Sequence, residues 1–408
     1  MATLGIDFGT SNTAAAVMAG DTVFRIPVEP GRETLPTSVF FDIDRKRTLI
    51  GSAANAALID GREGRFMRAL KSVLGTPLMR EQRQIGYEKM TLLEVVARFL
   101  STVRERAYDA TRLEFDTALS GRPVRFHPDP ARHAQAQVDL AEAYQIAGFK
   151  RVSFLPEPEA AALTAGPLEQ GQLGLVVDIG GGTSDFTLYR QDADAIHVLN
   201  SHGVRIGGTD FDRLLSLAHV MPLLGRGGAV RNAFGDGTTT APNAIFNDLA
   251  TWEKIAFLYT AETRRLVADL AKMGVDQQAF GRLDEVIEME LGHDIAFAVE
   301  AGKIAANDTP RGLIDLGTLD RGLSVPLSAQ ALGNTLSDLT ADIKEAAWET
   351  LGDTAPREVT AVVFVGGSSL MGTVTQAMAE LFPQARQVRA QAFTAVSDGL
   401  AMAAARLT

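Results

Sequence analysis

The sequence predicts an α/β fold that is duplicated along the chain. Residues 4–13 and 175–187 share one plan: a short apolar run with an aspartate at its end, a glycine turn, Thr-Ser, and a second run with apolar residues. This plan is typical of two strands joined by a tight turn. Residues 361–365 form a continuous apolar run before Gly-Gly-Ser-Ser, as expected for a strand buried on both faces of a sheet. The repeat and the buried strand together indicate two related halves.

The two glycine turns are candidate phosphate-binding loops. Glycine lets the backbone approach a ligand closely and point its N–H groups at an anion. The aspartates before the turns, Asp7 and Asp178, can hold a divalent cation through water, and this cation would neutralise the phosphates. An ordinary hairpin explains either copy alone. Two copies with Asp, Gly and Thr-Ser in the same order instead favour two loops that bind one nucleotide from opposite sides, as two jaws of one site.

The composition limits the class of protein. With 408 residues, of which 46% are hydrophobic and 22% charged, the chain can bury an ample core in two or more domain-sized units. The net charge of −11 argues against nucleic acid or an anionic membrane as the main partner. The chain has no cysteine, which excludes disulfides, thiol catalysis and zinc-thiolate sites. The start of the chain lacks a secretory signal pattern and no run reaches the ~18 apolar residues of a membrane span, so we expect a cytoplasmic protein.

Four segments follow the first turn. Residues 34–41 favour a strand because they end in Val-Phe-Phe. A basic segment, 62–71, precedes a helix predicted over 91–110, whose apolar residues recur at helical spacing. A second helix is predicted over 131–148, because this alanine-rich stretch ends in Gly148, where a helix C-cap is common.

A strand at 149–155 and a helix starting in 156–163 come before the second turn. Pro158 and Glu159 suit the first turn of that helix, where a missing N–H is harmless and a negative charge is favoured. Glu157 is expected just before the helix, at the strand end, where its carboxylate can face a ligand.

The second half contains more helix. Residues 207–212 open an apolar-periodic helix, 225–243 are rich in Gly, Thr and Asn and predict a loop, and an amphipathic helical region is expected over about 247–273. The buried strand at 361–365 leads through glycines into a helix, and such a helix N-terminus is also a potential anion site. A last helix is predicted over 392–407.

Five motifs carry a resemblance to a known family. They are residues 7–12, 157–162, 178–185, 207–212 and 366–368. Their order is that of the actin-like ATPase superfamily, and within it the sequence most resembles the nucleotide-binding domain of the heat-shock-70 (DnaK-type) chaperones. The resemblance covers essentially the whole chain and implies a duplicated, ribonuclease H-like α/β fold with two lobes around a nucleotide cleft.

The resemblance also implies a division into lobes. The N-terminal lobe would span 1–168, with an inserted subdomain at about 33–110, and the C-terminal lobe 169–408, with a helical insert at about 210–310. A full chaperone of the family continues into a linker, a peptide-binding β-sandwich and a helical lid. The chain is therefore similar to short, YegD-like members that keep only the nucleotide-binding unit.

The same resemblance implies roles for residues at the phosphates. Asp7, Asp178 and Asp185 would hold hydrated Mg²⁺ or orient water, Lys71 would stabilise charge on the transferring phosphoryl group, and Glu157 would position the attacking water. For Lys71, a surface position in a basic run is the alternative. The β- and γ-phosphates of ATP, or the phosphates of ADP, would contact Gly9, Thr10, Ser11, Asn12, Gly180, Gly181, Gly182 and Thr183. The implied chemistry is phosphoryl transfer to water, which depends on positioning and charge neutralisation.

The adenosine end matches the family less well. Glu300 and Lys303 resemble the helix that packs on the ribose and base, and the other nucleotide contacts implied are Gly207, Gly208, Gly366, Gly367 and Ser368. However, Ile304 and Leu370 stand where arginines are expected, and Phe393 where an aspartate is expected. We therefore expect an altered base pocket and weak nucleotide binding, micromolar or worse.

The function expected from the resemblance is a slow ATPase that acts as a nucleotide-dependent switch or chaperone-like factor. Its partners would be a nucleotide and an unfolded or client protein or an exchange factor, with no role for nucleic acid or membrane. An actin-like filament-forming ATPase, a small-molecule kinase and a nucleotide sensor without turnover are the alternatives. Closure of the lobes around ATP would couple the nucleotide to a partner.

Overall fold

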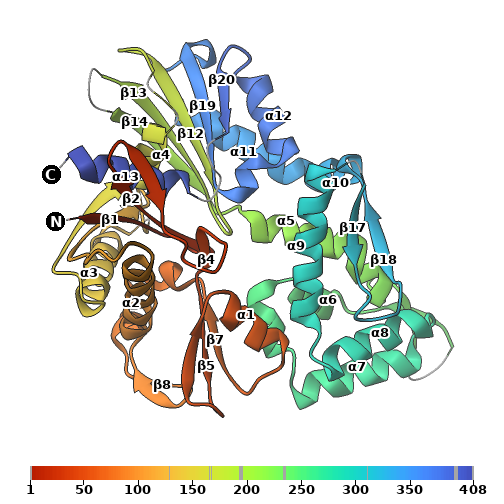
Figure 1. The fold of residues 1–408 in the computed structure, drawn as a ribbon. Coiled ribbons are helices and arrows are strands. Elements are labelled where there is room, and N and C mark those ends of the chain that lie inside the picture. The colour runs from red at the N-terminus through yellow and green to blue at the C-terminus, as the bar shows by residue number, and fades with distance from the viewer. Residues whose placement is uncertain are drawn as a thin grey trace. The chain divides into compact units, whose positions relative to one another are not determined.

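The computed structural model describes residues 2–127, 129–164, 166, 168–192, 196–232, 236–309, 311–389 and 394–406 (Figure 1). It divides into two compact units, and each is described by itself. Unit 1 comprises Met1–Arg205, Lys344–Leu370 and Met378–Thr408, and unit 2 comprises Ile206–Ile343 and Met371–Ala377. The predicted lobe division at residue 168 does not follow these units and stays a prediction.

Unit 1 contains two sheets with the same order of strand directions. In the first sheet, β3, β2 and β1 pair antiparallel, and β1, β10 and β11 pair parallel. In the second sheet, β14, β13 and β12 pair antiparallel, and β12, β19 and β20 pair parallel. The predicted duplicated α/β fold is thereby confirmed.

The strands of the first sheet are β1 Thr3–Phe8, β2 Asn12–Ala19, β3 Thr22–Arg25, β4 Thr34–Pro36, which pairs with β2, β10 Thr117–Arg122 and β11 Arg151–Pro156. Those of the second sheet are β12 Leu173–Ile179, β13 Ser184–Gln191, β14 Ile196–Val204, β19 Val359–Val365 and β20 Arg386–Arg389. As predicted, β19 lies inside its sheet, and most of its side chains are buried. Each glycine turn joins the two central antiparallel strands of a sheet.

Two helices lie between the sheets. One apolar cluster contains residues of β10, α4 (Glu157–Thr164), β12, β19 and α13 (Ala395–Arg406) (Figure 1). The contact is close, because a Cβ at Gly399 of α13 would overlap the Ala160 carbonyl of α4. The turn-forming ends of both sheets are thus held by one shared layer.

The other face of the first sheet is covered by the two predicted helices. α2 spans Leu92–Thr111 and starts with a capping box between Thr91 and Glu94, and α3 spans Pro130–Ile146. Gly148 follows α3 with a φ of 95°, so the expected glycine at the helix end is confirmed. Both helices contribute to one large apolar cluster that includes Leu4, Phe8 and Phe99.

The segment between β4 and α2 forms two small sheets of its own and shares the large apolar cluster through residues such as Phe41 and Leu74. It contains the three-stranded sheet β6-β5-β7, a two-stranded sheet and a helix. The bounds are β5 Ser38–Asp42, β6 Arg47–Ile50, α1 Ser52–Ile59, β7 Gly64–Arg68, η1 Leu70–Val73, η2 Pro77–Arg80, β8 Arg83–Ile85 and β9 Glu88–Met90. Much of the basic segment 62–71 is therefore strand β7, and Lys71 lies on the short 3₁₀ helix η1.

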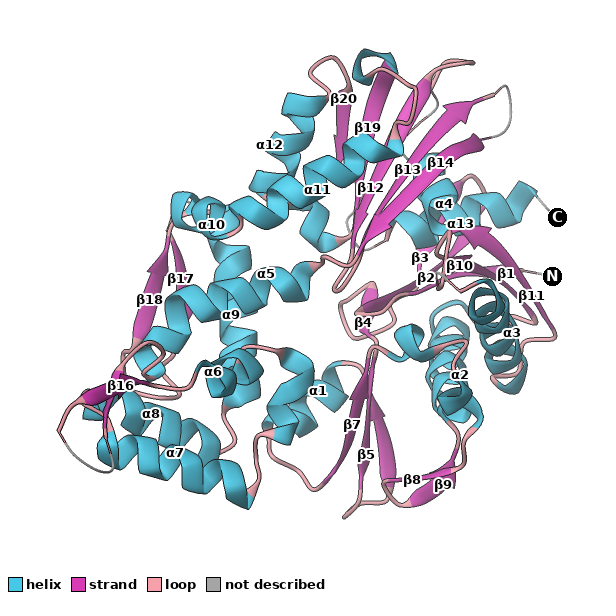
Figure 2. Ribbon diagram, turned by 180° about the vertical axis from the view of Figure 1, so that it is seen from behind, coloured by secondary structure: helices cyan, strands magenta, loops and turns pink. Residues whose placement is uncertain are grey.

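Unit 2 is mainly helical (Figure 2). Its core holds fully buried side chains from several helices, among them Phe211, Phe246 and Phe280. The elements are α5 Gly208–Leu215, η3 Ser216–Val220, η4 Met221–Leu224, β15 Ala229–Arg231, β16 Thr238–Thr240, α6 Asn243–Leu249, η5 Trp252–Phe257, α7 Ala261–Met273, α8 Gln277–Glu288, α9 Gly292–Asp308, β17 Gly312–Asp315, β18 Ser324–Leu327 and α10 Ala329–Thr335. Helices α11 (Ser337–Thr350) and α12 (Gly372–Leu381) belong partly to each unit, and η6 (Pro356–Glu358) and η7 (Gly367–Leu370) to unit 1.

Four sequence-based expectations differ from the structure. The loop predicted over 225–243 contains the antiparallel pair β15–β16, because Thr238 to Thr240 supply β-favouring side chains beside the glycines. The helical region 247–273 is broken between α6, η5 and α7, where Thr260 caps α7 by accepting the Thr263 N–H. Glu157 is the first residue of α4 instead of preceding it. The last helix starts at Ala395, and Phe393 lies outside the described residues.

Within the part of the chain that the structure describes, none of the helices combines the length and apolar composition needed to cross a membrane.

Candidate functional site

Both glycine turns are tight. At the end of β1, a Cβ on Gly9 would overlap the Asn12 carbonyl oxygen, so only glycine fits this turn. At the end of β12, the Gly180 N–H donates to the Thr183 carbonyl at 2.9 Å and closes the second hairpin. Each predicted strand–turn–strand unit is thereby confirmed as an antiparallel strand pair with a glycine turn.

The two turns meet within unit 1. A Cβ on Gly181 would overlap the Ser11 Oγ, which places the first turn directly against the second. The Ser11 carbonyl accepts the Thr37 N–H at 2.8 Å, and the hydroxyls of Thr13 and Thr37 are 2.8 Å apart. Thr37, between β4 and β5, therefore holds the first turn in place. This arrangement supports the interpretation as two jaws of one site.

Three aspartates border the turns. Asp7 lies near the end of β1, and Asp178 and Asp185 face each other as partners in the antiparallel pairing of β12 and β13. Gly366, at the end of β19, has a φ of 79°, and a Cβ there would lie 3.0 Å from Asp178 Oδ1. The third glycine motif therefore also borders this cluster, with Gly367 and Ser368 following it in η7.

The three aspartates all have raised pKa values. Burial, followed by the charge of Glu157, raises the pKa of Asp7 to about 7. The same causes raise the pKa of Asp185 to about 6, although a hydrogen bond from Thr183 acts in the opposite direction. Burial and the charges of Glu157, Asp185 and Asp7 hold the pKa of Asp178 well above its usual range. The site holds more negative charge than its own cations neutralise.

Lys71 reaches this cluster. Its Nζ lies 2.6 Å from Glu157 Oε1, and the two side chains are only 10% and 13% exposed. Burial alone would lower the pKa of Lys71, but the charges of Glu157 and Asp7 raise it. Lys71 is therefore not the surface lysine of the alternative interpretation, and an ion pair joins residues 86 positions apart.

The donor set fits a hydrated cation. Four carboxylates (Asp7, Glu157, Asp178 and Asp185) act electrostatically on one another and on the ammonium of Lys71. Among the described residues there is no group of three or more His, Cys, Asp or Glu side chains arranged to hold a metal ion directly. A divalent cation that keeps its water ligands suits this geometry, as magnesium commonly does.

The residues expected at the adenosine belong partly to unit 2. Gly207 and Gly208 start α5, and Lys303 of α9 is only 5% exposed, with its Nζ 2.8 Å from Asp212 Oδ1. Glu300 is exposed on α9. Ile304 is 51% exposed on the same helix. Lys303 is thus engaged in an ion pair within its own unit.

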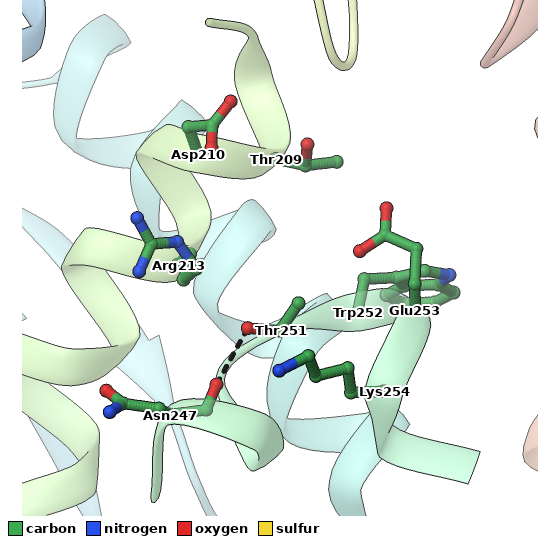
Figure 3. Close-up of a pocket in the computed structure, with 8 residues that line it drawn as sticks. All are labelled: Thr209, Asp210, Arg213, Asn247, Thr251, Trp252, Glu253 and Lys254. Carbon is green, nitrogen blue, oxygen red and sulfur yellow. Dashed lines mark hydrogen bonds between the residues drawn. The ribbon is translucent and has the colours of Figure 1, made fainter. Parts of the chain in front are cut away.

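Unit 2 also contains a cavity that sequence reasoning missed. It measures about 370 Å³ and is lined by Thr209, Asp210, Arg213, Asn247, Thr251, Trp252, Glu253 and Lys254. Figure 3 shows these side chains on α5 and on the stretch from α6 to η5. Two of its charged side chains form local contacts: Asp210 accepts the Gly207 N–H at 3.0 Å, and Lys254 pairs with Asp248 at 2.6 Å. Only Thr209 and Asp210 belong to a predicted motif.

Sequence reasoning also missed a buried tyrosine of α3. The Tyr144 hydroxyl donates to Ser120 Oγ of β10 at 2.9 Å. Burial raises the pKa of Tyr144, and the charges of Asp7 and Glu157 raise it further. This tyrosine therefore stays neutral beside the carboxylates. Its position within an alanine-rich helix gave no signal of this role.

Comparisons with known proteins agree with this geometry. The family model described as "Hsp70 protein" matches residues 3–223, a little over half of the chain. Two relatives named "Chaperone protein HscA homolog", from Burkholderia pseudomallei and Burkholderia mallei, are each 33% identical to this chain over 294 residues. Each alignment covers 64% of this chain and 46% of the relative. The chain thus spans about half the length of the curated relatives that it matches.

Proposed function

Because the chain belongs to the Hsp70 family, we propose that it binds ATP and ADP with Mg²⁺ and hydrolyses ATP slowly, as a nucleotide-dependent switch. The observation that carries the proposal is the meeting of the two glycine turns beside a lysine and four carboxylates, all within unit 1. Backbone N–H groups and hydroxyls of both turns would contact the phosphates. The relatives are named chaperones, so a client protein or an exchange factor is the partner we propose.

Asp7, Asp178 and Asp185 would hold the hydrated magnesium ion. Burial and the charge of Glu157 raise their pKa values, and a bound cation would favour their ionised forms. When bound, Mg²⁺ neutralises the phosphate oxygens and so lowers the barrier to phosphoryl transfer. The aspartates would act through the water ligands of the ion, because direct coordination by three side chains does not fit the geometry.

Glu157 and Lys71 would act on the reacting groups. The Glu157 carboxylate, near the end of β11, can orient the attacking water and accept its proton. The Lys71 ammonium would stabilise negative charge on the transferring phosphoryl group. Their ion pair of 2.6 Å holds both side chains at the phosphate turns before a nucleotide arrives. This arrangement reduces the reorganisation that the reaction requires.

A nucleotide sensor without turnover is a second candidate. Lys303 is paired with Asp212, and Ile304 presents an apolar surface on the helix expected at the base. Weak base recognition would lower the affinity for every nucleotide without changing the phosphate chemistry. The two candidates therefore differ in turnover and not in where the phosphates bind.

Calorimetry and phosphate release test the proposal. Wild-type chain is titrated with ATP and ADP in the presence of Mg²⁺, and phosphate release is followed for wild type, Lys71→Ala and Asp185→Ala. We expect binding and slow turnover in wild type, and a loss of turnover by about 10²–10³-fold in both variants. Lys150→Ala, an exposed lysine paired with Asp116, is the matched control and should behave as wild type. Binding without turnover would favour the sensor, and no binding at millimolar nucleotide would contradict both candidates.

A further inference from the structure

A buried aspartate of α3 forms hydrogen bonds that hold the segment carrying Lys71 against this helix. Asp139 is 1% exposed. Its Oδ2 accepts the Gly75 N–H at 2.9 Å, and its Oδ1 accepts from Arg80 Nη2 at 3.0 Å and from Gln135 Nε2 at 2.7 Å. Two of the three donors come from the segment that follows Lys71. The carboxylate thus joins both ends of residues 75–80 to α3.

The conformation and surroundings of Gly75 require a glycine at this contact. Its φ of 78° lies in the left-handed region, and a Cβ there would overlap the Arg132 carbonyl and lie 3.1 Å from Ala136 Cβ. The backbone at Gly75 therefore lies directly on α3. Any larger side chain would lift the segment away from the helix.

The three residues between Lys71 and Gly75 form a short rigid connection. Lys71 lies on η1, whose neighbours Leu70 and Leu74 are 3% and 4% exposed and belong to the core. The Leu74 N–H donates to the Lys71 carbonyl, and the Thr76 N–H donates to the Val73 carbonyl at 3.2 Å. A displacement at Gly75 is therefore transmitted to Lys71 through one hydrogen-bonded turn.

We propose that Asp139 is a positioning residue for Lys71. By holding Gly75 and Arg80 on α3, it fixes η1 where the Lys71 Nζ meets Glu157 Oε1 at 2.6 Å. Asp139 touches neither the phosphate turns nor the site carboxylates in these contacts, so it acts through Lys71. The inference rests on the proposed function, in which Lys71 stabilises charge on the phosphoryl group.

Asp139→Asn is the principal test. An asparagine has the same shape but only one acceptor oxygen, and its NH₂ group would face a donor, so it cannot satisfy all three donors of the aspartate. Glu142→Gln is the matched control, because Glu142 also binds Arg80, at 2.6 Å, but lies exposed on α3 and is not bonded to Gly75. Gly75→Ala is the second variant, since it lifts the segment while Asp139 stays intact.

Two measurements are made on each variant. In steady-state ATP hydrolysis, Asp139→Asn and Gly75→Ala should lower kcat by at least about tenfold and leave the KM for ATP within about twofold, because small displacements of a catalytic group act on the reaction step. In amide hydrogen exchange by mass spectrometry, residues 70–80 should exchange faster in both variants, and the centre of α3 should not. Glu142→Gln should match wild type in both measurements.

The outcomes separate this inference from the proposed function. Faster exchange at 70–80 with an unchanged kcat would overturn the positioning role, as would an equal loss of kcat in Glu142→Gln. If the wild-type chain shows no ATP turnover, the proposed function fails, and the exchange data still test whether Asp139 holds residues 70–80. Unchanged exchange at 70–80 in both Asp139→Asn and Gly75→Ala would then overturn the positioning role of Asp139. Faster exchange confined to that segment would support this role.

Discussion

The phosphate region of unit 1 and the α5–α9 region of unit 2 use their charged residues in opposite ways. In unit 1, the pKa values of Asp7, Asp178 and Asp185 are raised by burial and by the charge of Glu157. In unit 2, Lys303 and Asp212 neutralise each other at 2.8 Å. The first region is left short of positive charge, whereas the second is satisfied by its own residues.

The difference indicates which part of a nucleotide this chain is built to hold. Carboxyl groups with raised pKa values beside two glycine turns favour a cation and its phosphates, because a cation stabilises the ionised carboxylates. A satisfied ion pair next to the exposed Ile304 offers little to a base. We therefore propose that the phosphates and their cation supply most of the binding energy.

The largest effect that we expect on nucleotide affinity comes from the contact between the turns. Gly181→Ala places a methyl group where the Ser11 hydroxyl lies, so this hydroxyl must rotate away from the phosphates. We expect the Kd for MgATP to rise at least about tenfold, since a hydrogen bond to a charged group contributes about 1.5–3 kcal/mol. The melting temperature should change little, because a serine hydroxyl rotates easily.

Gly281→Ala is the control for that prediction. Gly281 lies on α8, outside the proposed site, a Cβ on it meets nothing within 4 Å, and its φ is not in the left-handed region. Titration calorimetry on both variants should therefore show a normal Kd for Gly281→Ala only. Equal affinities in the two variants would mean that the Ser11–Gly181 contact does not shape the phosphate site.

A smaller effect is expected on the stability of the fold, through the raised pKa values of Asp7 and Asp185. The pKa of Asp7 is raised from 3.8 to about 7 and that of Asp185 to about 6, so the folded chain holds protons that the unfolded chain has released between pH 4 and 7. By linkage, this contribution to stability is fully present below about pH 4 and is lost as the pH rises through about 7. Without Mg²⁺ or nucleotide, Asp7→Asn should raise the free energy of unfolding at pH 8 by about 1 kcal/mol.

Urea denaturation of wild type and Asp7→Asn at pH 5 and pH 8 measures this effect. The difference between the two proteins should grow with pH, because only the wild type must ionise the carboxyl group at position 7. Asp109→Asn, whose side chain is 71% exposed, should show the same pH dependence as wild type. A difference that shrinks as the pH rises would show that ionised Asp7 stabilises the fold.

The sequence predicted the parts of the fold that depend on local chemistry. The strand–turn–strand units around Gly9 and Gly180 could be predicted because glycine, aspartate and apolar runs act within about ten residues. Helix α2 was predictable from its apolar spacing, which places Leu100 and Val103 in the core. The hairpin of β15 and β16 was missed, because its Gly-Thr composition is equally typical of a loop.

The parts that depend on distant partners could not be read from local patterns. The pairing of Lys71 with Glu157 crosses 86 positions and was not predicted, although the family resemblance implied a role for each residue at the phosphates. Asp139 resembles any polar residue of a helix, and its burial depends on Gly75, which is 64 positions away. Likewise, the engagement of Lys303 by Asp212 follows from the packing of α9 on α5. Side-chain networks of this kind require the fold before they can be recognised.

Comparing ATP, GTP and tripolyphosphate in one calorimetric series, each with Mg²⁺, tests the central claim most directly. If the phosphate region of unit 1 supplies most of the binding energy, ATP and GTP should bind with Kd values within about tenfold of each other, or about 1.4 kcal/mol. Tripolyphosphate should bind at the same site and compete with both. ATP binding about 100-fold tighter than GTP, with no detectable binding of tripolyphosphate, would contradict the account and show that the base is recognised after all.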